Sequence, residues 1–171
     1  MDVNDPPRPL ALAGQGVAAL GAMLVLSWPV AAWWSPTLLT NVLPPGVALA
    51  GGNFGLLLAV SLLPALLFLG AMVEAFRLFG LVGRGLAFTD AMPRNLERLG
   101  LWAIGCAVAG FVTPTLMGLI ATAGAADGGR QLIIRFGSGE IAGLVMALLL
   151  LAFGRVMREA LRLARENREF V

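Results

Sequence analysis

Residues 9–73 contain no charged side chain, a stretch of 65 residues between Arg8 and Glu74. A helix that crosses a bilayer needs about 20 apolar residues, so this stretch is long enough for two crossings. The turn signals of segment Ser35–Pro45 divide it into two helices. Over the whole chain 58% of residues are hydrophobic and 13% are charged, whereas a soluble domain carries about 25% charged residues. The sequence therefore predicts an integral membrane protein, surrounded by the lipid bilayer.

Four membrane spans fit this chain. The uncharged stretches predict helices at about 10–34, 53–79, 99–123 and 136–158, followed by a cytoplasmic helical tail over 155–170. We expect the first helix to be retained, because its apolar stretch of about 25 residues exceeds the roughly 7–15 residues of a signal peptide. The predicted fold is an all-α four-helix transmembrane bundle, with residues 1–171 forming a single membrane domain.

The fourth span is less regular than the others, because only Ile141–Gly154 is free of charge. Either Glu140 lies inside the outer membrane boundary, or Arg155 and Arg158 lie beyond the inner one and extend their guanidinium groups to the headgroups. The second arrangement costs less, since the aliphatic stem of arginine is compatible with hydrocarbon, and we expect mostly that. On the outer side we expect a short extracytoplasmic strand pair between 131–136 and 47–50.

The arginines are distributed unequally between the two sides of the membrane. With four spans, the N-terminus, the loop between the second and third spans and the C-terminus share one side, which holds ten arginines. The other side holds only Arg130 and Arg135. Because arginine near span ends stays on the cytoplasmic side, both termini are predicted to be cytoplasmic.

The residue types needed for common enzyme chemistry are missing. All twelve basic residues are arginine, and the chain has no histidine, lysine or tyrosine and a single cysteine, Cys106. Ser138 lies between two glycines, but no histidine or lysine is available to activate it as a nucleophile. It is better explained as the start of a helix with Glu140 in the first turn. The sequence predicts a non-enzymatic protein with no catalytic residue, cofactor or metal site.

Glu74 and Arg77 lie three residues apart at the cytoplasmic end of the second span, which is the spacing of a pair on one helix face. They are the candidate intramembrane boundary pair. An ionisable group within a span is a functional candidate, such as a coupling site. The alternative is an ion pair at headgroup depth, and we favour this simpler interpretation.

Pro29, Pro64 and Pro114 fall inside three of the predicted spans and, with this topology, in the outer half of the bilayer. A proline in a helix leaves the carbonyl four residues earlier without its donor. We expect the hydroxyl groups of Ser27 and Thr113 to satisfy freed groups. A shared kink level would shape an outward-facing cavity, which is the basis of an alternative function as a small transporter or channel subunit.

Small residues recur at four-residue spacing in three of the spans, as at Gly14 and Ala18 and at Gly105 and Ala109. In lipid such faces let helix backbones approach closely. We expect them to pack the chain's own helices, with a homo-oligomer as the alternative.

Charge is concentrated in the loop between the second and third spans and in the tail. The glycines between residues 80 and 85 are expected to end the second helix, and Thr89 is expected to be the N-cap of a helix that runs into the third span. In the tail, ion pairs are expected four residues apart, as between Arg162 and Glu166. The arginines predicted to contact anionic lipid or a protein partner are Arg84, Arg94, Arg98, Arg155, Arg158, Arg162 and Arg165.

Three segments carry a resemblance to a known family. The sequence RGLAFT at 84–89 is followed by LERLG at 96–100, and the chain ends with the charged helical segment 159–171. These segments and their spacing resemble the domain of unknown function 2975 family of bacterial membrane proteins, over the whole four-helix plan. Where the family commonly has Asn followed by an aliphatic residue, this chain has Met92 and Pro93.

The family has no established activity, but its members are often encoded beside a small helix-turn-helix regulator. The resemblance therefore implies a location in the bacterial inner membrane and a role as membrane-bound partner of such a DNA-binding protein. In that role the loop Arg84–Arg98 and the tail Arg155–Val171 would be the contact surfaces, and the chain itself would not contact nucleic acid.

Overall fold

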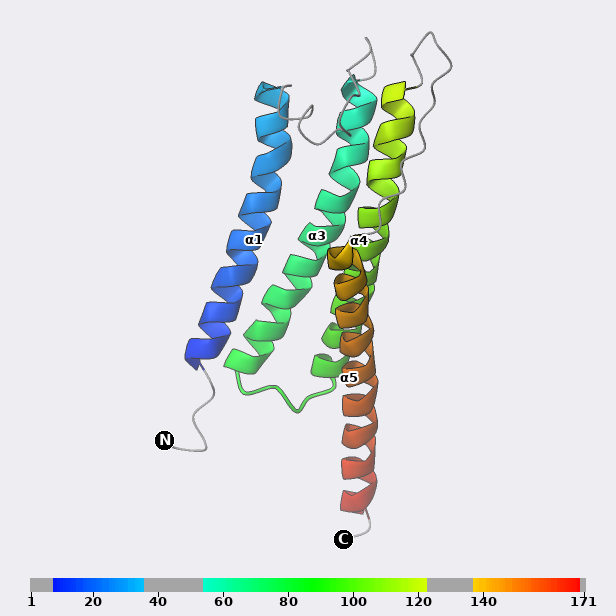
Figure 1. Cartoon of the computed structure of the whole chain (residues 1–171). Helices are drawn as coiled ribbons and strands as arrows, with labels where there is room; N and C mark the ends of the chain where they lie inside the picture. The colour runs from blue at the N-terminus through cyan, green and yellow to red at the C-terminus, as the bar shows by residue number, and fades with distance from the viewer. Residues whose placement is uncertain (1–7, 36–53, 123–136, 170–171) are drawn as a thin grey trace.

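The computed structural model describes residues 8–35, 54–122 and 137–169. These residues form four helices, α1 (Arg8–Trp34), α3 (Phe54–Gly83), α4 (Ala91–Thr122) and α5 (Ser138–Glu169) (Figure 1). All four are long and apolar enough to cross a membrane. The predicted all-α fold, with four helices of membrane-spanning length and hydropathy, is therefore confirmed for the described residues. The strand pair expected between 131–136 and 47–50 lies outside the described residues.

The helices pack in the order in which they occur in the sequence. α3 lies between α1 and α4, and α5 packs against α4. The four-helix bundle is thus an open row, because the extensive contacts within the described residues join only sequence neighbours. The start of α1, the loop between α3 and α4 and the end of α5 lie at the same end of the row (Figure 1). This is the end for which the arginine distribution predicts the cytoplasm.

Small residues make the closest contacts between neighbouring helices. Gly14 of α1 faces the ring of Phe79, where an added Cβ would lie 2.4 Å from a ring carbon. On α4, Gly105 lies against Leu67 of α3, and Ala109 is buried. The expected packing role of these residues within the chain is therefore confirmed for α1 and α4. In lipid, close approach of this kind replaces the hydrophobic effect as the source of helix association.

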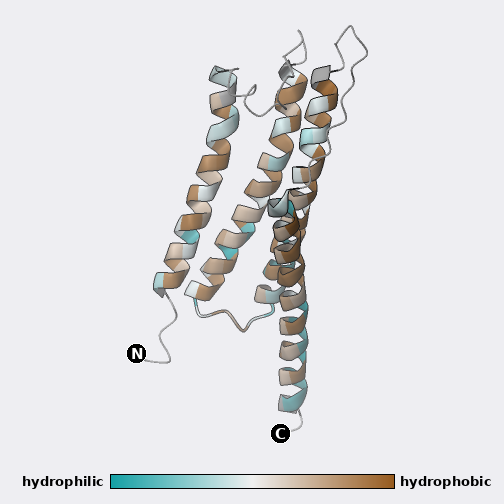
Figure 2. Cartoon of the chain, viewed as in Figure 1, coloured by the Kyte–Doolittle hydropathy of each residue, from teal (hydrophilic) through white to brown (hydrophobic). Residues whose placement is uncertain are grey.

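Large apolar side chains cover the outside of the row. Leu12, Leu24 and Val156 are each more than 60% exposed, and a surface this apolar is matched to lipid chains rather than to water. Figure 2 shows that α5 changes from hydrophobic to hydrophilic residues toward its C-terminal end. This end of α5 extends beyond the rest of the row (Figure 1).

α3 ends four residues later than the expected boundary at Phe79. Gly85 has a positive φ of 72°, and the amides of Leu86 and Gly85 donate to the carbonyls of Leu81 and Val82, which is the pattern of a Schellman C-cap. Glycine fits this position because it has no Cβ to clash in the left-handed conformation. The other two glycines, at positions 80 and 83, lie inside the helix and let α1 approach, so only one of the three ends it.

α5 begins part-way along α4 (Figure 1). Glu140, in the first turn of α5 as expected, lies against Gly110 of α4. Gly110 precedes the end of α4 at Thr122 by a length of about 18 Å at 1.5 Å per residue. Glu140 therefore lies beside the middle part of α4 rather than level with its C-terminal end, and its position relative to the membrane boundary stays a prediction.

Candidate functional site

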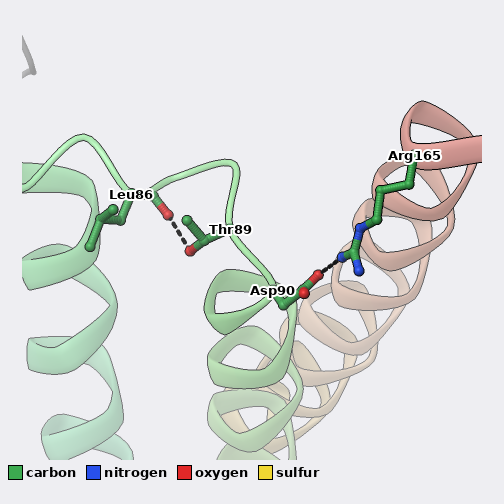
Figure 3. Close-up of polar contacts among 4 residues, drawn as sticks. All are labelled: Leu86, Thr89, Asp90 and Arg165. Carbon is green, nitrogen blue, oxygen red and sulfur yellow. Dashed lines mark hydrogen bonds and ion pairs between the residues drawn. The ribbon is translucent and has the colours of Figure 1, made fainter. Parts of the chain in front are cut away.

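The C-terminal part of α5 is fixed to the beginning of α4 by two ion pairs between distant parts of the sequence. The guanidinium group of Arg158 donates to the carboxylate of Glu97, and that of Arg165 donates to the carboxylate of Asp90 (Figure 3). Gly154 allows this approach, since an added Cβ would lie 2.8 Å from Glu97 and 3.2 Å from a backbone carbonyl of α4. The tail and the loop therefore form one continuous surface.

The loop presents Asp90 to the tail through its own hydrogen bonds. The hydroxyl of Thr89 donates to the carbonyl of Leu86 at 2.7 Å (Figure 3), so it is turned back toward the loop. The prediction of Thr89 as N-cap is wrong by one position, because α4 begins at Ala91 and Asp90 is the residue that precedes it. Asp90 lies just before the positive end of the α4 dipole and is free to pair with Arg165.

Two clefts adjoin this ion pair, and Asp90 and Arg165 line both of them. The first has a volume of about 510 Å³ and an apolar wall formed by Phe88, Leu161 and Ala164. The second has a volume of about 340 Å³ and is lined by four arginines and two carboxylates. We call the two clefts together the loop–tail surface; the four arginines are Arg94, Arg158, Arg162 and Arg165.

The structure brings together these four of the seven arginines predicted as contact residues. Arg84 lies apart from them, at the end of α3, where it lines smaller clefts with Gln15 of α1. Arg98 and Arg155 are exposed, and within the described residues neither forms an ion pair. The seven residues therefore divide into one cluster and three separate positions.

Ion pairs along the tail hold Arg162 in place. Its guanidinium group lies 2.7 Å from the carboxylate of Glu159 and 3.5 Å from that of Glu166, so the expected pair with Glu166 is confirmed. Exposed pairs of this kind contribute at most about 1 kcal/mol, so a partner carrying carboxylates can compete for these arginines. Arg94 has no carboxylate partner among the described residues and is open to such a contact.

The candidate boundary pair forms as the spacing predicted. Arg77 Nη1 lies 2.9 Å from Glu74 Oε1. Glu74 is buried, whereas the side chain of Arg77 is 57% exposed. The second carboxylate oxygen of Glu74 is buried without a hydrogen-bond partner among the described residues. The pair thus combines a buried carboxylate with an arginine that reaches the surface.

A cavity of about 470 Å³ lies between α1, α3 and α4. It is lined by Pro64 and by Trp28 and Thr113, the neighbours of the other two prolines, so a cavity is present at the proline level. That it faces the outer side of the membrane stays a prediction. The expected role of the nearby hydroxyl groups is wrong. Ser27 donates to the carbonyl of Leu24, three residues earlier, and the hydroxyl of Thr113 has no partner among the described residues.

The comparison with protein families agrees with this architecture. A family model described as protein of unknown function (DUF2975) matches residues 12–171. The chain belongs to the DUF2975 family. Searches of the curated proteins and of the solved structures found no match. The DUF2975 match includes the loop, the tail and the cavity, so all the sites described above lie within the region that defines the family.

Two functional candidates in this DUF2975 protein were not found from the sequence. Phe88 is 84% exposed on the loop–tail surface, and an aromatic residue in a short polar turn is the signal that could have indicated it. Leu161 faces it from α5 only because the ion pairs bring the tail to the loop, which sequence spacing does not reveal. Among the described residues, no three Cys, Asp or Glu side chains come together as metal ligands.

Proposed function

We propose that this DUF2975 protein is a non-enzymatic, multi-pass protein of the bacterial inner membrane that binds a soluble partner through its loop–tail surface. The observation that carries the proposal is the ion pair between Arg165 and Asp90, which joins the tail and the loop into one surface. α5 extends well past its apolar part, and its final turns carry charged side chains. A tail that served only as a membrane anchor would not need this cross-helix pairing.

The chemistry of the surface favours an amphipathic acidic segment as the bound element. Phe88 and Leu161 offer an apolar contact, and Arg94 and Arg162 offer guanidinium groups beside it. A helix with an apolar face and carboxylates at its edge would satisfy both. The partner that we propose is a small helix-turn-helix regulator, which the membrane protein would hold without contacting nucleic acid itself.

Coexpression with a small helix-turn-helix regulator of the kind encoded beside members of the family tests the proposal. The full-length membrane protein is purified and the recovery of the regulator is measured. We expect the double variant R162Q/R165Q, and a chain lacking residues 162–171, to reduce this recovery at least fivefold. The variant R130Q/R135Q removes the same charge at other positions and should recover the regulator as the unchanged protein does. Equal recovery with all four chains would contradict the proposal.

The arginines outside the cluster support a second contact, with the membrane surface. Arg98 and Arg155 are exposed near the point where α4 and α5 become charged. Arginines at this depth are each stabilised by about 1 kcal/mol beside anionic headgroups. We therefore assign the lipid contact to these two residues and the partner contact to the loop–tail surface.

A function as a small transporter or channel subunit is the alternative, and the cavity at the proline level favours it. Kinked helices that line a cavity are a feature of transporter binding sites. The test is solute flux into liposomes that contain the purified protein. Flux above that of protein-free liposomes would support the alternative, and its absence across a broad solute panel would exclude it.

A further inference from the structure

The cavity between α1, α3 and α4 carries an inference that does not depend on the proposed function. No charged side chain lines it, and two aromatic side chains, Trp28 and Phe68, form part of its wall. Its volume of about 470 Å³ is within the range of small-molecule sites, roughly 300–1,000 Å³. Leu24, which also lines it, is 70% exposed, so the cavity opens on the surface that faces lipid.

One buried hydroxyl group in this wall is unsatisfied. Thr113 is only 7% exposed, and its Oγ1 has no hydrogen-bond partner among the described residues. An unmade hydrogen bond at a buried polar group costs about 1–3 kcal/mol. A threonine hydroxyl in a helix usually bonds to a carbonyl of the preceding turn, as that of Thr115 does, which donates to the carbonyl of Phe111. Threonine in a helix uses either of two rotamers, so rotation of χ1 can turn the Thr113 hydroxyl toward the cavity.

The same wall also offers an acceptor. Ser61 of α3 lines the cavity, and its hydroxyl donates to the carbonyl of Leu58 at 2.7 Å. A hydroxyl oxygen that donates its proton keeps lone pairs that can accept, so Ser61 Oγ is an acceptor in this wall. The cavity therefore combines the Thr113 hydroxyl of α4, which has no partner among the described residues, with the accepting hydroxyl oxygen of Ser61 on α3, inside an otherwise apolar wall.

We propose that this cavity binds a lipid-soluble ring alcohol or phenol. A ligand hydroxyl can accept a hydrogen bond from Thr113 and donate one to Ser61 Oγ, so it pairs with both groups. The flat ring would contact Trp28 and Phe68, and an apolar tail would leave through the opening beside Leu24. An acyl chain lacks the hydroxyl and would leave Thr113 unsatisfied, and a polar solute would meet too few hydrogen-bonding groups.

The full-length protein in lipid nanodiscs tests this proposal with tritium-labelled para-nonylphenol. Binding to empty nanodiscs is subtracted, and para-nonylanisole, which carries a methyl ether in place of the hydroxyl, is the matched ligand. We expect saturable binding of one phenol per chain and at least tenfold weaker binding of the ether. The isosteric variant Thr113→Val should bind the phenol about tenfold more weakly, the effect of one hydrogen bond.

Three variants complete the test. Thr113→Ser keeps the hydroxyl and should bind as the unchanged protein does, and Thr115→Val, whose hydroxyl is already used, should do the same. Ala65→Leu places a larger side chain in the cavity wall and should abolish binding. The proposal is overturned if the phenol shows no saturable binding, if the ether binds equally well, or if Thr113→Val binds as the unchanged protein does. Because the loop–tail surface is unaltered in these variants, failure here leaves the partner proposal standing.

Discussion

The indole ring of Trp102 on α4 lies directly against the backbone of Gly70 on α3. A Cβ added at Gly70 would come 2.7 Å from two carbons of the ring, closer than atoms of a packed interior approach one another. A tryptophan near the end of a membrane span is commonly an interfacial anchor. The structure adds a packing role, in which the ring fills the space that the absent side chain of Gly70 leaves.

We predict that Gly70→Ala destabilises the protein by about 1–3 kcal/mol, because the rigid indole cannot give way without shifting α4. The matched control is Gly16→Ala on α1, where an added Cβ meets nothing within 4 Å. This change should leave the thermal unfolding temperature equal or slightly higher, since alanine is the better helix former. Thermal unfolding in detergent measures both, and equal behaviour of the two variants would refute the packing role.

For the boundary pair, Arg77→Gln should destabilise the protein by about 1–3 kcal/mol, because the buried carboxylate of Glu74 loses its only described partner. The double variant Glu74→Gln/Arg77→Gln should recover part of that loss, since no charge is then left unpaired. Arg98→Gln, at an exposed arginine without a described partner, should change stability by less than about 0.5 kcal/mol. A loss for Arg77→Gln no larger than that for Arg98→Gln would contradict the prediction.

For the link between the loop and the tail, Asp90→Asn should speed amide hydrogen exchange over residues 159–169 while changing global stability by less than about 1 kcal/mol. The pair is exposed and contributes little energy, but it tethers the end of a helix, where local opening is easiest. The charge-exchanged variant Asp90→Arg/Arg165→Asp should restore slow exchange. Arg155→Gln is the control, and exchange that responds equally to it would show that the tether is unimportant.

The predicted orientation is testable in a Cys106→Ser background with single cysteines introduced at Thr89 or Ser35. Because the arginine-rich side is retained in the cytoplasm, a membrane-impermeant maleimide should label the cysteine at position 89 only in opened cells. The cysteine at position 35, at the opposite end of α1, should be labelled in intact cells. The reverse labelling pattern would overturn the orientation.

Much of the fold could be predicted because its determinants are local. Uncharged stretches located all four helices, and the helix at Thr89 was anticipated to within two residues of its start at Ala91. The end of α3 was placed too early, at Phe79, because the end of an apolar stretch indicates where a helix leaves the lipid, and not where the helix stops. The helix itself continues until a residue such as Gly85 caps it.

The remainder of the site depends on contacts that periodicity cannot reveal. Asp90 and Arg165 are 75 positions apart, and only the packing of α5 on α4 brings them together. The hydroxyl of Ser27 illustrates the same limit at short range. The sequence showed that it is near a carbonyl freed by Pro29, but the rotamer that it adopts turns it to Leu24 instead.

Each helix in the row packs against the helix that is synthesised just before it. When a helix leaves the insertion machinery, the helix that it packs against is therefore already in the bilayer. α1 and α3 can pack together before α4 is synthesised. Contacts of this kind form quickly, because little chain entropy is lost in bringing neighbours together. A ribosome stalled after α4 would already have released three of the four helices of the row, with α5 and the surface that its tail completes still to be made.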